Sequence, residues 1–421
     1  MSQPLAAAAA EFHFAPRVLD AAQRACDDCE QPWRARDENA LRVTAKVVGA
    51  FARAQVNESH LSGSTGYGYH DAGRAKYEAL VADLMGTPRA IARLQLVSGT
   101  QAIVATLSAL LGDGDTLCAL TGRPYDTLRL ALADHPAGLA RNGVRYVEAA
   151  WPEKRCSSAP AVRAALQARP AVAFIQRSRG YAPRPSLTIA QLAELIEAVR
   201  THAPGALVVV DNCYGEFVEL DEPGDVGADA VVGSLIKNPG GGIALTGAYI
   251  AGTNDVIERV AERIFAPGLS TAVGPTLDSL RSCLAGLHRA PKAVSESLKI
   301  MDFAAALFAR LGYAVDPACG AQRGDIIQAI RLGSEAKLAA FAAGLQRLLA
   351  INAAATPEPG PVPGYAEPVI MAGGAFVSGS TMELSCDAPL REPYEVYVQG
   401  GMDLAHGLLA VMSAASQVLS A

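Results

Sequence analysis

The sequence of 421 residues predicts an α/β protein, in which a mainly parallel sheet carries helices on both faces and a smaller α+β domain follows. Between about residues 77 and 250, helical patterns alternate with short apolar runs rich in β-branched residues. Strands that are separated by helices in this way pair in parallel and are buried on both faces. Beyond about residue 290, one long helical pattern precedes mixed helices and strand-like pieces.

The elements follow from local patterns. Apolar residues at helical spacing predict helices at 77–84, 101–111 and 189–199. Short apolar runs predict strands at 116–120, 171–175, 206–210, 230–232 and 248–250. The C-terminal part is expected to hold helices at 293–311 and 334–349, strands at 326–330 and 382–385, and a loop at 353–368. We expect an N-terminal helical arm (1–60), a large α/β domain (61–290) and a small α+β domain (291–421).

Composition excludes several classes of protein. Hydrophobic residues make up 50% of the chain and charged residues 19%, which excludes a disordered or fibrous protein. The net charge of −6 offers no basic surface for nucleic acid and no polybasic membrane anchor. The alanine run 6–10 follows no Lys or Arg, unlike a secretory signal, and no apolar stretch reaches the length of about 18 residues that a spanning helix needs. We expect a cytoplasmic protein with neither nucleic acid nor membrane as partner.

The cysteines and histidines do not predict a metal site. Eight cysteines are spread too sparsely for a disulfide framework. Cys26 and Cys29 have the CxxC spacing of metal or redox sites, but they lie in a helical pattern and no second such pair accompanies them. We interpret them as reduced structural thiols. The seven histidines form no pair at ligand spacing, so we expect no metal.

Lys237 is the most informative residue. It lies in a Gly/Pro-rich loop, 26 residues after Asp211, which ends the apolar strand predicted at 206–210. Pyridoxal phosphate (PLP) chemistry needs such a pair: a lysine that forms a Schiff base with the cofactor aldehyde, and a carboxylate that keeps the pyridine nitrogen protonated. Ligands of parallel sheets bind beyond the carboxyl ends of the strands, where Asp211 falls. Lys237 is therefore the expected cofactor lysine and catalytic base.

Further residues supply the rest of a cofactor site. A helix start with small residues offers backbone N–H groups to a phosphate, and the expected phosphate-binding residues are Ser98, Gly99, Thr100 and Gln101. Ser234 is a second expected phosphate contact. Tyr125 follows a predicted strand end, where its ring could stack on the pyridine and its hydroxyl could serve as a catalytic acid. The alternative is a turn tyrosine that packs on a loop.

The candidates for substrate binding are polar and aromatic groups in loops. The Gly-interrupted loop 64–74 presents groups that reach a phosphate or a carboxylate, unless the loop is purely structural. Arginines after the strand 171–175 and near the C-terminus could clamp an amino-acid carboxylate, or they could pair with nearby acids. The residues concerned are Tyr67, Tyr69, Arg74, Arg177, Arg179 and Arg391.

With these motifs assembled, the chain resembles the aluminium-resistance or methionine γ-lyase branch of the cystathionine γ-synthase-like, fold-type-I PLP enzymes. The motifs are STGYGYHDAGR (64–74), SGTQAI (98–103), TGRPYDTL (121–128), IQRSRGY (175–181), VDNCYGEFVE (210–219), GSLIKNPGGGIA (233–244) and GSTMELSCDAPLREPY (379–394). The resemblance implies the fold-type-I transferase fold with a seven-stranded sheet. It also implies Lys237 as the Schiff-base lysine and Asp211 as the partner of the pyridine nitrogen.

Three positions depart from the family pattern. Ile236 stands where the γ-synthases carry a hydroxyl before the lysine, and Gln101 stands where the branch usually has histidine. The Tyr-x-Arg pair that γ-lyases donate across a dimer interface has no clear counterpart, and Tyr67, Tyr69 and Arg74 are its nearest candidates. The resemblance implies a homodimer or homotetramer in which a neighbouring subunit completes each site.

The function that these observations predict is that of a PLP-dependent carbon–sulfur lyase. Such an enzyme would act on a sulfur-containing or γ-substituted amino acid by γ-elimination. One alternative is another PLP reaction on an amino acid, namely γ-replacement, transamination or an aldolase-type step. A rival of another class is a non-catalytic protein of the same fold that binds a metal or a partner; the presence of both Lys237 and Asp211 disfavours it.

Overall fold

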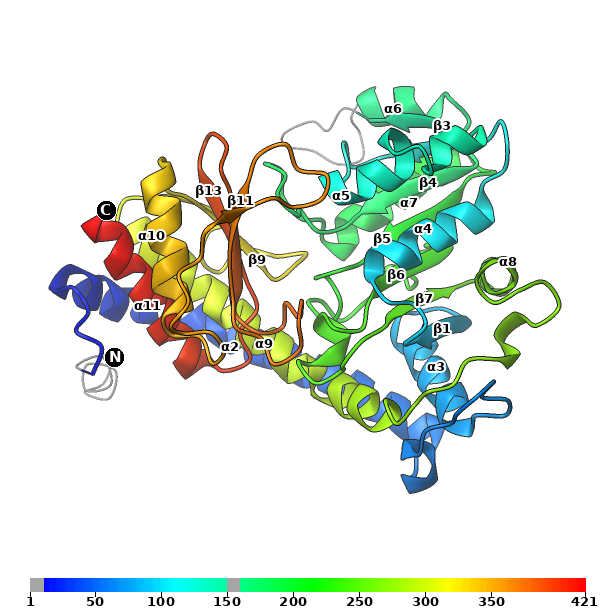
Figure 1. The fold of residues 1–421 in the computed structure, drawn as a ribbon, viewed down its shortest axis with the longest axis horizontal. Coiled ribbons are helices and arrows are strands. Elements are labelled where there is room, and N and C mark those ends of the chain that lie inside the picture. The colour runs from blue at the N-terminus through cyan, green and yellow to red at the C-terminus, as the bar shows by residue number, and fades with distance from the viewer. Residues whose placement is uncertain (1–10, 150–159) are drawn as a thin grey trace. The chain divides into compact units, whose positions relative to one another are not determined.

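The computed structural model describes residues 11–149 and 160–421, so the alanine run 6–10 lies outside the described residues. The described chain forms two compact units: residues 43–290, and Pro291–Ala421 together with residues 11–42 (Figure 1). Residues of the expected arm 1–60 thus contribute to both units. Two long helices continue from one unit into the other, α2 (Pro16–Ala54) and α9 (Leu280–Arg310).

The unit of residues 43–290 contains a seven-stranded sheet with the order β1-β7-β6-β5-β4-β2-β3. Its strands are β1 (Arg89–Arg93), β2 (Thr116–Ala119), β3 (Arg145–Glu148), β4 (Val172–Gln176), β5 (Leu207–Asp211), β6 (Ala230–Ser234) and β7 (Ala248–Gly252). The β3-β2-β4-β5-β6 part is parallel throughout, whereas β7 runs antiparallel to both β6 and β1. The predicted mainly parallel, seven-stranded sheet is confirmed.

Both faces of this sheet are buried. In β5, Val209 belongs to one apolar cluster together with Ile103 of α4 and Val260 of α8, while Val208 and Val210 project to the opposite face and are equally inaccessible to solvent. The helices of this unit are α3 (Ala72–Leu84), α4 (Gly99–Leu110), α5 (Asp126–Arg129), α6 (Pro160–Leu166), α7 (Ile189–His202) and α8 (Asn254–Ile264). Short helical turns lie at η1 (Glu58–Leu61), η2 (Leu130–Asp134), η3 (Leu139–Asn142), η4 (Asn238–Gly240) and η5 (Ser270–Ala272).

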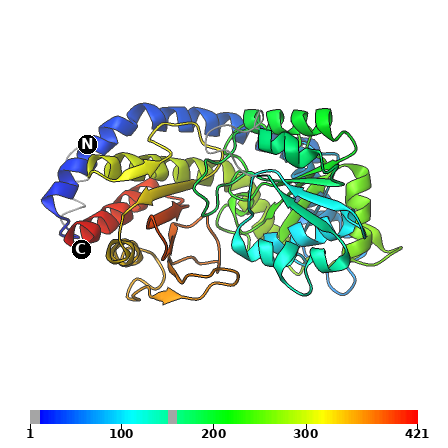
Figure 2. The ribbon, with the colours of Figure 1, turned by 90° about the horizontal axis from the view of Figure 1, so that it is seen from above.

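The other unit contains a six-stranded antiparallel sheet with the order β10-β11-β12-β13-β9-β8. Its elements are β8 (Ala314–Asp316), β9 (Ile327–Arg331), α10 (Glu335–Gln346), β10 (Pro359–Gly360), β11 (Val369–Gly373), β12 (Ser385–Pro389), β13 (Glu395–Gln399) and α11 (Leu404–Ser420). Side chains of α2, α9, α10 and α11 share one apolar core with this sheet, and Figure 2 shows α11, in red, beside α9. The expected α+β composition of the C-terminal part is confirmed.

Several predicted elements differ from the structure. The helix predicted at 77–84 begins at Ala72, and the loop predicted at 353–368 contains β10. The helix predicted at 293–311 begins earlier, at Leu280, because α9 continues through Pro291 despite the backbone hydrogen bond that a proline removes. The strand predicted at 382–385 begins only at Ser385, as β12, and residues 382–383 lie in a bend before it. Within the described residues, no helix has the length and apolar character needed to cross a membrane.

Candidate active site

Four chain segments meet at one edge of the seven-stranded sheet. Asp211, the last residue of β5, pairs with Gln176 at the end of β4 and with Val232 of β6. Ser234 ends β6 opposite Ala248 of β7. Because β4, β5 and β6 are parallel, their carboxyl ends share this edge. Asp211 therefore lies where parallel sheets bind their ligands, as predicted.

Lys237 lies in the loop that joins β6 to its antiparallel neighbour β7. The loop is closed by a hydrogen bond of 2.9 Å from the Leu235 N–H to the Gly247 carbonyl. Its glycines allow the backbone to lie against α9: a Cβ atom on Gly286 would come within 2.2 Å of the Gly240 carbonyl oxygen. A close glycine–glycine contact thus fixes the loop that carries the lysine.

The Lys237 ammonium lies over an aromatic ring. Its Nζ is 3.5 Å from the ring centroid of Tyr214, which is cation–π distance, and the side chain is half-buried. Enclosure by protein alone would lower the pKa of Lys237, but the neighbouring Tyr214, Cys213 and Asp211 outweigh it and raise the pKa above its ordinary value. The residues after Asp211 therefore hold Lys237 at this edge.

Asp211 is a buried carboxyl close to the lysine. Its Oδ1 accepts a hydrogen bond of 3.1 Å from the Cys213 N–H. Burial raises the pKa of Asp211, and the charge of Lys237 and the Cys213 hydrogen bond oppose the rise. A buried carboxyl of this kind is stabilised as an anion by a cationic partner.

The start of α4 lies against the same residues. Ser98 caps the helix by accepting a hydrogen bond of 3.1 Å from the Gln101 N–H, and the Gln101 side chain accepts one of 2.7 Å from the Val97 N–H. A Cβ atom on Gly99 would lie 3.2 Å from the Cys213 sulfur and 3.4 Å from the Ser234 Cβ. Ser98, Gly99 and Ser234 therefore lie together, and the first N–H groups of α4 are directed at this space.

Tyr125 joins the cluster through its hydroxyl. Tyr125 Oη and Thr100 Oγ1 are 2.9 Å apart. Burial raises the pKa of Tyr125, and the Asp211 carboxylate raises it further, which places the phenol within electrostatic range of that carboxylate. Tyr125 thus stays protonated at neutral pH and remains available as a proton donor.

Arg177 and Arg74 are two of the predicted substrate-binding residues, and the structure shows their guanidinium groups bound to other parts of the protein. Arg177 is fully buried, and its guanidinium donates to Leu187, Asn212, Gly215 and Glu219. The Arg74 guanidinium donates to the backbone carbonyls of Gly68, Ala272 and Gly274. Because these donors are engaged within the protein, both arginines hold loops in place: Arg177 supports the segment after β5, and Arg74 supports the loop 64–74.

The remaining predicted substrate residues are differently placed. Tyr67 and Tyr69 are 72% and 52% exposed, with ring centroids 5.6 Å apart, so they form an aromatic surface. Arg179 is buried beyond the end of β4. Arg391 is half-buried in the other unit, between β12 and β13. The structure therefore brings Lys237, Asp211, Tyr125, Ser98, Gly99, Thr100 and Ser234 together in one unit, and Gln101 flanks them at the helix start.

We expect the loss of Arg177 to destabilise the fold. Arg177→Met would leave the buried carboxylate of Glu222, 3.5 Å from the guanidinium, without its cationic partner. Breaking a buried pair costs about 3–5 kcal/mol, which corresponds to a drop of roughly 5 °C in the Tm of an apoprotein of this length. Arg53→Met, which breaks an exposed pair with Asp83, is the matched control and should change the Tm little. Equal Tm values for the two variants would contradict the structural role of Arg177.

Three residues of the site escaped sequence reasoning although they directly follow Asp211. Tyr214, with a positive φ of 71°, turns its ring under Lys237, and Cys213 lies against Gly99. Glu216 is fully buried: its Oε1 accepts a hydrogen bond of 2.9 Å from the Tyr249 hydroxyl, and within the described structure its Oε2 has no hydrogen-bond partner. The only sequence signal was their adjacency to Asp211 in the segment 210–219.

The stability of the apoprotein should depend on Glu216 and pH. Burial raises the pKa of Glu216 to about 8. Between pH 5 and pH 8 the folded carboxyl keeps a proton that the unfolded one releases, so the free energy of unfolding falls by about 1.4 kcal/mol for each pH unit of rise. Glu216→Gln has no carboxyl to titrate at this position and avoids this loss. The difference between its urea midpoint and that of wild type should therefore increase steadily from pH 5 to pH 8. Glu197→Gln, on the exposed side of α7, should run parallel to wild type. A constant difference for Glu216→Gln would contradict the protonated carboxyl.

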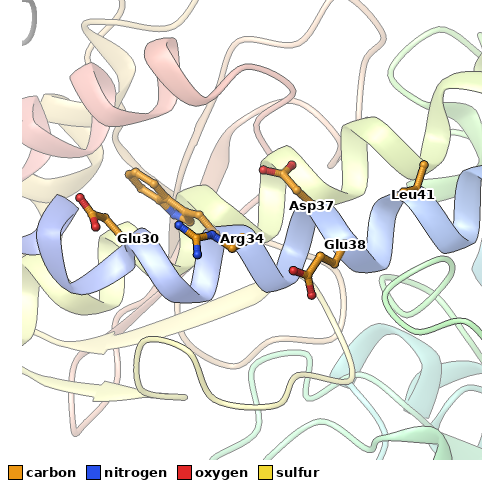
Figure 3. Close-up of a pocket in the computed structure, with 6 residues that line it drawn as sticks. Glu30, Arg34, Asp37, Glu38 and Leu41 are labelled. Carbon is orange, nitrogen blue, oxygen red and sulfur yellow. The ribbon is translucent and has the colours of Figure 1, made fainter.

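A surface hollow of about 650 Å³ also lies along α2 (Figure 3). It is lined by Glu30, Trp33, Arg34, Asp37, Glu38 and Leu41. All six come from one helix and mainly carry charges, which does not fit the enclosed, largely apolar character of small-molecule sites. Among the residues that the structure describes, no cluster of three or more His, Cys, Asp or Glu side chains could hold a metal ion.

Comparison with known proteins decides the family. Residues 18–419 match the family model described as "Methionine gamma-lyase". The chain belongs to the methionine γ-lyase family. The chain is 40% identical over 387 residues to the uncharacterised protein YnbB of Bacillus subtilis, covering 91% of this chain and 92% of that protein. The predicted membership of the aluminium-resistance and methionine γ-lyase group is thus confirmed.

Solved structures agree with the family. A carbon–sulfur lyase involved in aluminium resistance from Clostridium novyi NT superposes with a TM-score of 0.93 and 34% identity, covering 99% of this chain and 100% of that one. The Escherichia coli protein YhfS, described as pyridoxal-5′-phosphate-dependent, superposes with a TM-score of 0.61 and 17% identity over 91% of this chain and 96% of that one. The latter likeness shows the fold alone. The fold of the PLP-dependent fold-type-I enzymes is therefore confirmed for this member of the methionine γ-lyase family.

Proposed function

We propose that the protein binds PLP and uses it to break a carbon–sulfur bond in a sulfur-containing amino acid, by γ-elimination. The observation that carries this proposal is the convergence of Lys237, Asp211 and the start of α4 at one edge of the sheet. Membership of the methionine γ-lyase family and similarity to a carbon–sulfur lyase support the same reaction.

The residues present fit the cofactor. Asp211 is a buried carboxyl, which suits a cationic pyridine nitrogen, and Lys237 offers an amine close to it. Because Gly99 has no side chain, the space between it and the side chains of Cys213 and Ser234 stays open. The hydroxyls of Ser98 and Ser234 and the N–H groups at the start of α4 suit a phosphate. Tyr125 lies within electrostatic range of Asp211 and can cover the ring.

When bound, PLP supplies an electron sink that stabilises negative charge at the substrate carbons. The chain supplies positioning, charge and proton transfer around it. Lys237 would hold the cofactor and would move the proton at the substrate α-carbon. Asp211 holds the positive charge on the ring nitrogen. Tyr125, kept protonated by burial and by Asp211, donates its proton to the departing sulfur.

Product analysis tests this proposal. The protein purified with PLP is incubated with L-methionine, L-homocysteine, L-cystathionine and an O-acylhomoserine, and 2-oxo acids, ammonia and thiols are measured. γ-Elimination should give 2-oxobutanoate and ammonia in equal amounts, together with one equivalent of methanethiol from methionine or of hydrogen sulfide from homocysteine. Pyruvate from cystathionine in place of 2-oxobutanoate would show β-elimination. Amino-acid products without ammonia would show replacement, and either result would contradict γ-elimination.

We further propose that the active form is a homodimer or homotetramer in the cytoplasm. The exposed aromatic pair Tyr67 and Tyr69 supports the loop 64–74 as a contact with a second copy. Arg74 shapes this loop and so contributes to that contact only indirectly. Sedimentation of the holoenzyme tests the assembly, and mixing inactive Lys237→Ala with an inactive Tyr67 variant should restore activity. A fully active monomer would contradict the proposal.

A further inference from the structure

Two cysteines far apart in the sequence meet in the unit that contains the C-terminal sheet. Cys29 lies on α2, and Cys319 lies in the loop between β8 and β9. Their sulfur atoms are 3.4 Å apart, which is a thiol–thiol contact. A disulfide bond has an S–S length of about 2.05 Å, so a movement of about 1.4 Å would join the two atoms.

Neighbouring contacts fix the loop against the helix. A Cβ atom on Gly320 would lie 3.0 Å from Pro32 of α2, so the backbone next to Cys319 touches the helix directly. Arg36, two turns after Cys29, donates a hydrogen bond of 2.9 Å to the Ala321 carbonyl. The residues that directly follow Cys319 are thus anchored close to Cys29.

A buried ionic cluster strengthens the same junction. Asp302 of α9 accepts hydrogen bonds from Arg36, Arg323 and the Gly320 N–H. Asp302 and Arg323 are both inaccessible to solvent. Because such a cluster needs all its partners in place, it holds α2, α9 and the loop in one arrangement. The two sulfurs are therefore neighbours in the folded unit and do not meet by chance.

The two thiols differ in chemical character. Of the seven cysteines that the structure describes, Cys319 is the one that is not buried. A hydrogen bond from Cys29 lowers the pKa of Cys319, and Arg323 lowers it further. The pKa of Cys29 is raised by its hydrogen bond to Cys319 and by burial. Cys319 thus has the accessibility and thiolate character of an attacking thiol, with a protonated thiol beside it.

We propose that Cys29 and Cys319 form a redox modification site, in which a peroxide oxidises the two thiols reversibly to a disulfide. The Cys319 thiolate attacks one peroxide oxygen, the O–O bond breaks, and a sulfenic acid forms with release of water after proton uptake. The Cys29 sulfur then attacks the sulfenic sulfur, and the hydroxyl leaves with the Cys29 proton as a second water. Two thiols are oxidised and one hydrogen peroxide is reduced to two waters. A small dithiol then reduces the disulfide to the two thiols and is itself oxidised to a cyclic disulfide.

The experiment treats the full-length holoenzyme with a few equivalents of hydrogen peroxide. Free thiols are then blocked, the chain is digested without reduction, and the peptides are identified by mass spectrometry. One linked peptide pair, Cys29 with Cys319, is expected, and dithiothreitol should remove it. Cys29→Ser should stop at a sulfenic acid on Cys319 that dimedone traps, and Cys319→Ser should yield no linked pair. Cys26→Ser, one turn from Cys29 on the same helix, is the matched control and should form the pair like wild type.

Wild-type peptide mapping gives a decisive result even where a serine variant fails to fold. Cys29 and Cys319 that stay fully alkylatable, under peroxide that oxidises an equal amount of glutathione, would overturn the proposal. A disulfide that joins Cys26 or Cys156 with equal yield would also overturn it, because it would show that the 3.4 Å contact does not direct the reaction.

Discussion

Lys237→Ala is expected to abolish carbon–sulfur bond cleavage while leaving the fold intact. Lys237 is the amine beside the buried Asp211, and it is assigned both the anchoring of the cofactor and the proton transfer at the substrate. Loss of a general base alone costs about 10²–10⁴ in rate, and loss of the anchor adds to this, so turnover should fall by at least about 10³. The measurement is 2-oxo acid formation at saturating substrate and cofactor.

Lys76→Ala provides the control for this variant, because Lys76 lies on α3, which carries none of the residues assigned to the cofactor site. It should retain wild-type turnover. The Tm of the Lys237→Ala apoprotein should fall only slightly. Burial raises the pKa of Asp211, so this carboxyl can take up a proton when its cationic neighbour is lost, and the contact between Gly240 and Gly286 still fixes the loop. More than about a tenth of the wild-type rate in Lys237→Ala would remove the lysine from the mechanism.

Asp211→Asn is expected to lower turnover by about 10²–10³, the general scale for losing a preorganised electrostatic partner. The asparagine keeps the size of the side chain and can accept from the Cys213 N–H, but it cannot hold a positive charge on a ring nitrogen. Cofactor absorbance should change in the variant, because the ring would lose its proton. Both kcat and the absorption spectrum are measured.

Asp225→Asn is the matched control, since Asp225 forms a partly exposed ion pair with Lys46. Its effect on kcat should be small, as is typical of exposed pairs. Wild-type kcat in Asp211→Asn would mean that the pyridine nitrogen is not the electron sink, and the assignment of Asp211 would then be wrong.

Five of the seven strands were predictable because they are short, apolar runs. The strands β1 and β3 were not predicted, because charged residues flank their few apolar positions. Val208, Val209 and Val210 are all buried, so a continuous apolar run without alternation was the correct signature of a covered parallel strand. The reversed direction of β7 was not predictable, because the run at 248–252 has the same character as a parallel strand. The direction of β7 is set by the loop that contains Lys237, because this loop turns the chain back alongside β6.

The residues of the candidate site also differ in how predictable they were, depending on whether their role follows from a local feature or from distant contacts. Lys237, Asp211 and Ser98 were predictable, because a lysine loop, a strand end and a helix start are local features. The fates of Arg177 and Arg74 were not, since their partners lie up to 200 residues away, as Gly274 does from Arg74. Tyr214 reaches Lys237 only because of a positive φ of 71°, which the sequence did not reveal.

The most direct measurement of the central claim is borohydride reduction of the wild-type protein after incubation with PLP. The chain has seven lysines, and the account predicts that the reduced cofactor is found on Lys237 alone after digestion and mass spectrometry. The protein should be yellow before reduction and lose that colour on reduction. A colourless protein after PLP addition, or cofactor fixed to another lysine, would contradict the account.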